Sequence, residues 1–452
     1  MADRQRLTPT IFKAYDVRGV YPDEINEDAA YRIGRAFVQF LDVPSVVVGR
    51  DMRMSSPTLA EAIMRGIVDQ GADVTDLGLT TTDELYFAVG KFGYPAGLMI
   101  TASHNPGRYN GFKLCKANAV AMSSDTGLYD IRDIAISGTF ANPKGTGSVL
   151  HRDVTEEYVS HVLSFIDIAN VRPLKIAVDA GNGMAGMIIP NVFQHLPCEL
   201  VPLYFDLDGT FPNHPASPIE PENTEELRKV VVEQGCDMGV AFDGDADRMF
   251  LIDEKGRLLG GDMVTALVSE SLLQRFPNST VLYNLICSRS VPEVIERSGG
   301  HAVRTRVGHS YIKASMRELD AIFGGEHSGH FYFRDNWYAD SGLIAFLIVL
   351  ELISRSGQSV SALLQPIDVR FRSGEINTEV HDQSAKMKMI EKYFSDRGAE
   401  IDHLDGITIN FATWWCNIRP SNTEPLLRLN VEADSPAELE ARRDEVLALI
   451  RS

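Results

Sequence analysis

The chain repeatedly alternates short β-branched runs with loops and helix-period segments, and this alternation limits its fold more than any other feature. Clear examples are the runs at 45–48, 97–100 and 175–178, each of which is followed by a polar loop. Strands that alternate with helices form parallel sheets, and functional loops gather at the carboxyl ends of such strands. We therefore predict an α/β fold.

Three breaks divide the 452 residues, a length that allows two to four domains. The first break, at 138–149, is rich in Gly, Pro, Thr and Ser; the second is the turn at 254–262, and the third is 354–371. We therefore predict four segments, with the boundaries 1–148, 149–254, 255–366 and 367–452.

The chain is acidic, since 43 Lys and Arg against 62 Asp and Glu give a net charge of −19. Such a surface repels phosphodiester backbones and anionic lipids, so we expect neither nucleic acid nor membrane as a partner. The longest apolar run, Gly342 to Leu350, stops at Glu351, short of the roughly 18 residues of a membrane span, and predicts a core helix. No secretory signal is visible, and five cysteines without a C-x-x-C pair argue against a disulfide framework, so we expect a cytoplasmic location.

Three carboxylates lie within five residues in Asp243-Gly-Asp245-Ala-Asp247-Arg248. A hard divalent cation would explain this density of negative charge. The spacing to Glu254 also fits an EF-hand, but Arg248 stands where that loop needs Gly, and the flanks resemble strands instead of helices. We therefore predict Mg²⁺ at a strand end, with a plain acidic turn as the alternative.

The segment 181–186, Gly-Asn-Gly-Met-Ala-Gly, matches the dinucleotide fingerprint G-x-G-x-x-G and follows a strand-like run. Taken alone, it would indicate a nicotinamide-dependent dehydrogenase. Asp179 at the strand end would repel a pyrophosphate, however, and Pro190 would interrupt the helix that binds it. We favour glycines that serve a tight turn and close packing.

A possible nucleophile, Ser103, lies in the loop TASHNP (101–106) after the apolar run 97–100. The alternative is an ordinary turn stabilised by side-chain hydrogen bonds to the backbone. The sequence contains neither the hydrolase motif G-x-S-x-G nor a P-loop, which argues against a serine hydrolase and a P-loop kinase.

Two further loops have the composition of ligand-binding sites. The loop 324–330, GGEHSGH, places Glu326 among polar groups suited to a polyhydroxylated ligand, although a solvated turn fits it equally well. The segment 419–428 combines Arg419 and Arg428 with hydroxyls and turn amides, which suits a phosphate dianion, with a capped turn as the alternative.

Together these loops resemble the α-D-phosphohexomutase superfamily, and most closely its bacterial phosphomannomutase/phosphoglucomutase branch. In chain order, TASHNP resembles the family's phosphoserine loop, DGDADR its magnesium loop, GEHSGH its sugar loop and RPSNTEPLLR its phosphate-binding loop. Supporting matches are YDVRG at 15–19, NGFK at 110–113, FPNHPASPIEPEN at 211–223 and RVGHSYIK at 306–313. One departure is Ile286, where many relatives have a lysine.

The resemblance implies four domains around a central cleft: three related α/β domains and a smaller α+β C-terminal domain, each contributing one loop. It implies a phosphorylated Ser103 that binds Mg²⁺ together with Asp243, Asp245 and Asp247, and a hexose 1,6-bisphosphate as activator. Lys113 and His309 become candidates for the general base, while Arg18 and Arg248 would stabilise phosphoryl oxygens. The implied substrate contacts are Tyr15, His104, Glu326, Ser328, Arg419, Ser421, Asn422, Thr423 and Arg428.

The implied reaction interconverts hexose 1-phosphate and hexose 6-phosphate, with mannose, glucose or both as the expected sugars. Phosphoglucosamine mutase is the close alternative, although its sugar loop usually carries Gln where this chain has His327. A dehydrogenase and a catalytically silent sugar-phosphate binding protein remain as alternatives from other classes. We expect the chain to act as a monomer or a homodimer.

Overall fold

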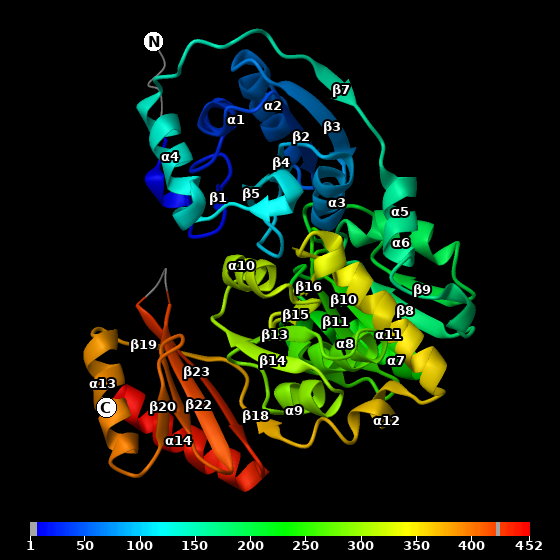
Figure 1. The fold of residues 1–452 in the computed structure, drawn as a ribbon, viewed down its shortest axis with the longest axis vertical. Helices are drawn as coiled ribbons and strands as arrows, with labels where there is room; N and C mark the ends of the chain where they lie inside the picture. The colour runs from blue at the N-terminus through cyan, green and yellow to red at the C-terminus, as the bar shows by residue number, and fades with distance from the viewer. Residues whose placement is uncertain (1–6, 422–424) are drawn as a thin grey trace.

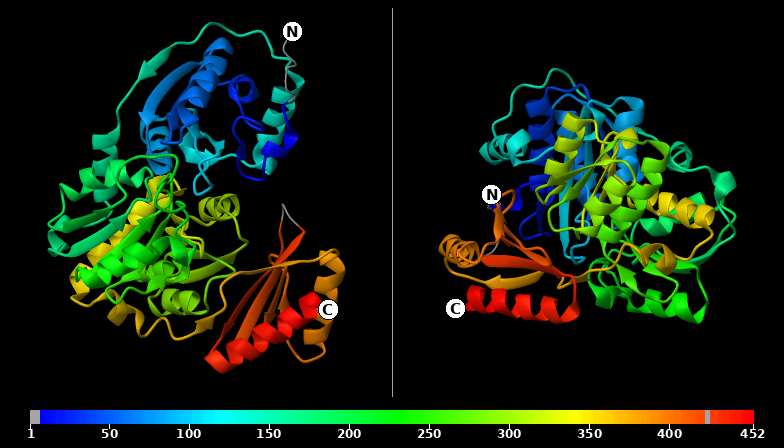
Figure 2. Two further views of the ribbon diagram at one scale, coloured as in Figure 1. Left: turned by 180° about the vertical axis from the view of Figure 1, so that it is seen from behind. Right: turned by 60° about the horizontal axis from the view of Figure 1, so that its bottom comes forward.

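The computed structural model describes residues 7–421 and 425–452, which form four sheets in chain order (Figure 1). The bodies built on these sheets follow one another in an arc, and Figure 2 shows the same order from behind. A single extended segment leads into the last body, which contains the C-terminus.

The first sheet has the strand order β1-β5-β4-β2-β3-β7, with β6 paired to β5. Its strands are β1 (Val17–Val20), β2 (Ser45–Arg50), β3 (Asp73–Leu79), β4 (Ala96–Ile100), β5 (Tyr109–Lys116), β6 (Val120–Ala121) and β7 (Val149–His151). Its helices are α1 (Glu27–Leu41), α2 (Ser56–Asp69), α3 (Thr82–Phe92) and α4 (Leu128–Ser137). Helices α1, α2 and α4 share one apolar core, whereas α3 packs into a second core that continues through the next two bodies.

The second sheet has the order β12-β11-β10-β8-β9, and the third has the order β14-β13-β15-β16-β17. The second body contains α5 (Thr155–Leu163), β8 (Lys175–Asp179), α6 (Ala185–Phe193), β9 (Glu199–Leu203), α7 (Glu225–Glu233), β10 (Met238–Phe242), β11 (Met249–Asp253) and β12 (Leu258–Leu259). The third contains α8 (Gly261–Arg275), β13 (Thr280–Asn284), α9 (Ser290–Arg297), β14 (His301–Thr305), α10 (His309–Leu319), β15 (Phe323–Gly325), β16 (Phe331–Phe333), β17 (Ala339–Asp340), α11 (Gly342–Ser356) and α12 (Val360–Leu364).

The three α/β bodies repeat one arrangement of strands. In each, a central strand pairs in parallel with the strand two before it in the chain on one side, and antiparallel with its immediate successor on the other: β2-β4-β5, β8-β10-β11 and β13-β15-β16. The loop between the central strand and its antiparallel successor therefore leaves the carboxyl end of an equivalent strand each time. These three loops contain Ser103, the Asp243 triad and Glu326.

The C-terminal body is a separate antiparallel sheet, β18-β23-β22-β21-β20, with β19 paired to β23. Residues of both its helices, such as Phe394 and Val446, join the sheet residues in one core, so both helices pack on the same face. The elements are β18 (Phe371–Arg372), β19 (Ile376–Glu379), α13 (Gln383–Ser395), β20 (Glu400–Asp402), β21 (Ile407–Asn410), β22 (Trp414–Pro420), β23 (Leu426–Ala433) and α14 (Pro436–Arg451).

Two strands lie just after the segment boundaries predicted from the sequence but belong to the sheet before them. β7 lies after residue 148 but pairs with β3 of the first sheet, and β12 lies after residue 254 but pairs with β11 of the second. Composition marks where a chain turns, whereas strand pairing depends on partners that are distant in sequence. We therefore propose domain boundaries a few residues later, after β7 and after β12.

The apolar run at 342–350 forms the first part of α11, which is buried along almost its whole length in the core shared by the second and third bodies. The predicted core helix is thus confirmed. Across the part of the chain that the structure describes, we find no helix with the length and apolar character of a membrane span.

Candidate active site

The loop after β4 holds Ser103 in a backbone conformation that is uncommon for a residue with a side chain. Its φ is 50°, in the left-handed region, and its backbone N–H donates to Thr101 Oγ1 at 2.9 Å. The buried guanidinium of Arg53 supports the loop by donating to the carbonyls of Ser103 (2.8 Å) and Asn105 (2.7 Å). The loop is therefore built to present this serine in one orientation.

Three side chains surround the Ser103 hydroxyl, namely those of Asp243 and Arg248 from the aspartate loop and of the adjacent His104. Ser103 Oγ donates to Asp243 Oδ2 at 2.7 Å and accepts from Arg248 Nη2 at 3.0 Å, and His104 Nδ1 lies 3.2 Å away. The Arg248 guanidinium and burial lower the pKa of His104 well below its usual value, so this imidazole is neutral. Ser103 is 4% exposed and lines a cavity.

The three aspartates of the second loop converge with ligand atoms within 4.8 Å of one another. All three are buried, and Asp245 Oδ1 and Asp247 Oδ1 have no hydrogen-bond partner within the described chain. Burial, reinforced by the charge of Asp245, raises the pKa of Asp247 well above its usual value. Clustered oxygen ligands with unsatisfied atoms fit a hard divalent cation such as Mg²⁺.

Lys113, from β5, provides the positive charge nearest to this triad. Its Nζ lies 2.7 Å from Asp245 Oδ2 and 2.5 Å from Asp247 Oδ2. Burial alone would lower the pKa of Lys113, but these two carboxylates raise it well above its usual value. The lysine therefore keeps its proton and balances charge that a metal ion would otherwise balance.

A cavity of about 300 Å³ opens beside Ser103 between the first, second and third bodies. Its lining includes seven residues expected from the sequence: Tyr15, Arg18, Ser103, His104, Lys113, Arg248 and His309. Asp247, expected only as a metal ligand, also lines it, together with five residues that sequence reasoning did not select: Lys13, Asp16, Tyr86, His330 and Asp340. Such a volume is at the lower end for small-molecule sites.

Besides His104, two further neutral imidazoles line this cavity. Burial, with the nearby Lys313 charge, lowers the pKa of His309 to about 4. Burial and the charge of Arg248 lower the pKa of His330 well below its usual value. His330 belongs to the sugar-loop motif, so the motif could have indicated it, whereas Asp340 lies in no motif and meets the cavity only through the fold.

Glu326 is occupied by protein donors in this structure. Its Oε2 accepts from Tyr332 OH at 2.6 Å, and its Oε1 accepts from the backbone N–H of Gly308 at 3.1 Å. The second of these bonds connects the sugar loop to the residue that precedes His309. Ser328 Oγ lies 3.2 Å from His330 Nδ1, so this serine lies next to the cavity lining.

The fourth loop lies in the C-terminal body, at the end of β22 and the start of β23. Arg419 and Arg428 are directly opposite in this strand pair, and both contact Glu375. The backbone N–H of Ser421 donates to Leu426 O at 2.8 Å. Asn422 and Thr423, expected as phosphate ligands, lie outside the described residues.

The fingerprint-like glycines at 181–186 support the aspartate loop. A Cβ at Gly183 would lie 2.7 Å from the carbonyl oxygen of Gly244, and Met184 N–H donates to that same carbonyl at 2.9 Å. Helix α6 continues through Pro190, so the expectation that this proline interrupts the helix is wrong. The preferred interpretation, glycines for close packing, agrees with this arrangement.

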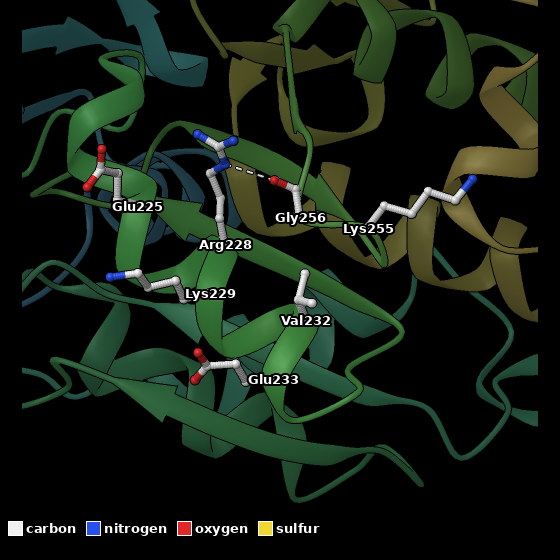
Figure 3. A pocket seen from close by; sticks show the side chains of 7 residues that line it. All are labelled: Glu225, Arg228, Lys229, Val232, Glu233, Lys255 and Gly256. Carbon is white, nitrogen blue, oxygen red and sulfur yellow. Dashed lines mark hydrogen bonds between the residues drawn. The ribbon is translucent and has the colours of Figure 1, made fainter.

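A separate hollow of about 510 Å³ lies on α7 and the turn after β11, away from the four loops (Figure 3). Charges of both signs line it, namely Glu225, Arg228, Lys229, Glu233 and Lys255, and Arg228 Nε donates to Gly256 O at 2.8 Å. Its charged groups largely balance one another, and it contains none of the residues that surround Ser103.

Four family profiles match the chain: Phosphoglucomutase/phosphomannomutase alpha/beta/alpha domain I at residues 9–141, domain II at 156–256, domain III at 260–369 and the C-terminal domain at 375–449. The chain belongs to the phosphoglucomutase/phosphomannomutase family. It is 41% identical over 452 residues to a phosphomannomutase of Salmonella montevideo, covering 98% of this chain and 99% of that protein. It is 43% identical over 447 residues to the phosphohexose mutases of Xanthomonas campestris pv. campestris, covering 98% and 100%.

A solved structure of a phosphoglucomutase/phosphomannomutase family protein from Burkholderia thailandensis superimposes with a TM-score of 0.90 at 34% identity, covering 98% of both chains. The resemblance expected from the sequence is thus confirmed, as is an α/β fold with three α/β domains and a C-terminal domain. Both of these relatives are mutases. The prediction that the chain is a mutase is therefore confirmed, in preference to a dehydrogenase.

Proposed function

We propose that this mutase interconverts hexose 1-phosphates and hexose 6-phosphates, with mannose and glucose as its sugars, through a phosphorylated Ser103. The observation that carries the proposal is the position of Ser103 Oγ, 2.7 Å from Asp243 Oδ2 and 3.0 Å from Arg248 Nη2. A phosphoryl group on this oxygen would lie between the aspartate triad and a buried guanidinium. That setting is suited to phosphoryl transfer, in which positioning and charge neutralisation dominate.

In the first half-reaction, the bond between phosphorus and Ser103 Oγ breaks while a bond to the free sugar hydroxyl forms. The product is a hexose 1,6-bisphosphate, and the hydroxyl proton passes to a base in the cavity. After the sugar turns around, Ser103 Oγ accepts the other phosphoryl group, which regenerates phosphoserine and releases the isomeric monophosphate. A hexose 1,6-bisphosphate supplied from solution would prime unphosphorylated Ser103 by the same second step.

Mg²⁺ held by Asp243, Asp245 and Asp247 would supply charge neutralisation at the transferred phosphoryl oxygens. Arg248, which is paired with Asp243 at 2.8 Å, donates to Ser103 Oγ and would stabilise charge on the transferred phosphoryl group. Arg18, which already donates to Asn105 in the serine loop, would contribute a second guanidinium. These residues act on the group being transferred, while Tyr15 and His104 line the space for the sugar.

For the base, we propose an imidazole of the cavity, His309 or His330, in place of Lys113. Both imidazoles have lowered pKa values and are neutral near pH 7, so each can accept a proton. Lys113 has a raised pKa and is paired with two carboxylates, so it retains its proton and its charge.

For the phosphate that does not react, we propose the pocket of Arg419, Ser421, Asn422, Thr423 and Arg428. Two guanidiniums on directly opposite residues can bind one dianion with paired hydrogen bonds. Glu326 and Ser328 would bind sugar hydroxyls, which requires Glu326 to exchange its bond from Gly308 for one from the sugar. A site that binds the hydroxyls shared by mannose and glucose does not separate these epimers.

The test combines turnover with intact mass. We expect comparable rates on mannose 1-phosphate and glucose 1-phosphate after priming with glucose 1,6-bisphosphate, and a slower rate on glucosamine 1-phosphate. The mass of the primed protein should rise by one phosphoryl group, and Ser103→Ala should show neither the added mass nor turnover. Full activity of Ser103→Ala would disprove the phosphoserine mechanism, and a faster rate on glucosamine 1-phosphate would favour phosphoglucosamine mutase.

A further inference from the structure

A carboxylate of the chain itself occupies the two guanidiniums of the proposed phosphate pocket. Glu375 Oε2 lies 2.6 Å from Arg419 Nη2, and Glu375 Oε1 lies 3.2 Å from Arg428 Nη1. We propose that Glu375 competes with the substrate phosphate for these arginines and thereby keeps the phosphate site exchangeable. This inference rests on the proposed function, because it assigns Arg419 and Arg428 to phosphate.

The strand register explains why Glu375 reaches both arginines. Arg419 on β22 is directly opposite Arg428 on β23, and Asn377 on β19 is opposite Arg428 on the other side. Residues two apart along an extended segment face the same way, so Glu375 lies on the face that carries both guanidiniums. Like charges directly opposite in a sheet repel each other, and Glu375 offsets that repulsion when no other anion is present.

The contact leaves the arginines incompletely satisfied. Arg419 Nε and Arg428 Nε are buried and have no hydrogen-bond partner among the described residues. A single carboxylate offers two oxygens, whereas a phosphate offers more acceptors and a second negative charge. The carboxylate is also 26% exposed, so it can move into solvent when phosphate enters.

The charges of the two arginines and of Glu375 predict whether Glu375 strengthens or weakens phosphate binding. Two guanidiniums and one carboxylate have a net charge of about +1, whereas two guanidiniums with a neutral amide would have about +2 toward an incoming dianion. A site that is free to bind for only a fraction of the time has an apparent affinity that is reduced in proportion to that fraction. Glu375 should therefore weaken phosphate binding, which suits a site that must release one phosphate of the sugar and accept the other.

The experiment measures binding without turnover, in full-length protein carrying Ser103→Ala. Calorimetric titrations with inorganic phosphate and with glucose 6-phosphate compare this parent with the additional changes Glu375→Gln and Glu379→Gln. Glu379 ends β19 and is exposed, and among the described residues it forms no ion pair with an arginine, so it is the matched control. We expect Glu375→Gln to lower the dissociation constants by roughly threefold to tenfold at low ionic strength, with a smaller gain at 0.5 M salt, and no change for Glu379→Gln.

Weaker or unchanged binding by Glu375→Gln would overturn the inference, since the carboxylate would then orient the arginines instead of competing. Glu375→Asp is a second variant should the glutamine destabilise the sheet; its shorter side chain should give a smaller gain of the same sign. Arg419→Gln separates this inference from the proposed function. Loss of binding in Arg419→Gln with no gain in Glu375→Gln would reject only the competition, whereas unchanged binding in Arg419→Gln would reject the phosphate pocket itself.

Discussion

Ser103 Oγ donates a 2.7 Å hydrogen bond to Asp243 Oδ2, although 140 positions separate the two residues. The bond joins the loop after β4 to the loop after β10, which leave equivalent strands of two related sheets. The candidate nucleophile and the candidate metal ligands therefore lie together because the same arrangement of strands is used twice.

We predict that Asp243→Asn slows phosphorylation of Ser103 by about 10²–10³-fold, because it removes a proposed metal ligand and a negative charge beside the Ser103 oxygen. Intact mass after timed exposure to glucose 1,6-bisphosphate measures this step directly. Asp237→Asn, just before the other end of β10, is the control and should keep the parent rate. Equal phosphorylation of Asp243→Asn and the parent would exclude the aspartate from the reaction.

We predict opposite effects of Lys113→Met on stability and on metal binding. Without metal, Asp245 and Asp247 lose their nearest cation, and the free energy of unfolding should fall by roughly 3 kcal/mol. With the competing ammonium removed, Mg²⁺ should bind roughly tenfold more tightly. Thermal unfolding with and without Mg²⁺ measures both effects, and Lys116→Met, whose Nζ donates to the exposed Thr126 carbonyl and lies over the Phe40 ring, is the control. A variant less stable in both conditions, with no extra gain from Mg²⁺, would contradict this account.

We predict that kcat/KM reaches a plateau above about pH 7.5, once the substrate phosphate has lost its second proton near pH 6. An imidazole base gives this plateau because the pKa of His309, about 4, is too low for the imidazole to be protonated at neutral or alkaline pH. A lysine base with a raised pKa would instead increase kcat/KM about tenfold per pH unit toward alkaline pH. Profiles of the parent, His309→Asn and His330→Asn on glucose 1-phosphate distinguish these cases, and a continued alkaline rise would assign the base to Lys113.

The sequence indicated which loops meet, because motif residues follow strand-like runs and the carboxyl ends of related strands converge. Such local patterns are sufficient to identify Ser103 and the three aspartates as candidate site residues. It could not select Arg53, which holds the serine loop from inside the first body, or Asp340, which belongs to no motif. Glu375 was missed for the same reason, since its two arginine partners are 44 and 53 positions away. Contacts between distant residues are set by strand register, which local patterns do not reveal.

The boundaries between domains were less predictable than the loops. Breaks rich in Gly and Pro mark turns, but β7 and β12 are added to the edges of preceding sheets after such breaks. Edge strands of two or three residues carry little hydrophobic periodicity of their own. Their sheet membership depends on the neighbouring strand and on no feature of their own sequence.

A single buried carboxylate links the three α/β bodies. Asp83 of α3 accepts from Tyr158 OH of α5 at 2.6 Å and from Ser341 Oγ, just before α11, at 2.8 Å. Burial raises the pKa of Asp83 to about 6, from an ordinary value of 3.8. At a pH between 3.8 and about 6, Asp83 is deprotonated in the unfolded chain but still protonated in the folded protein. The stabilisation from this group is therefore complete below about pH 4 and is lost as the pH rises through about 6.

We therefore predict that Asp83→Asn flattens the decline of the unfolding free energy between about pH 4 and pH 6, by at most roughly 3 kcal/mol. Denaturant unfolding at a series of pH values measures this slope. Tyr158→Phe retains the carboxyl group and removes one donor that favours its charged form, so the slope should persist or steepen while stability falls by about 1 kcal/mol. An unchanged slope in Asp83→Asn would show that another group governs the acid range, and the nearby Glu84, whose pKa burial raises to about 7, would be the next to replace.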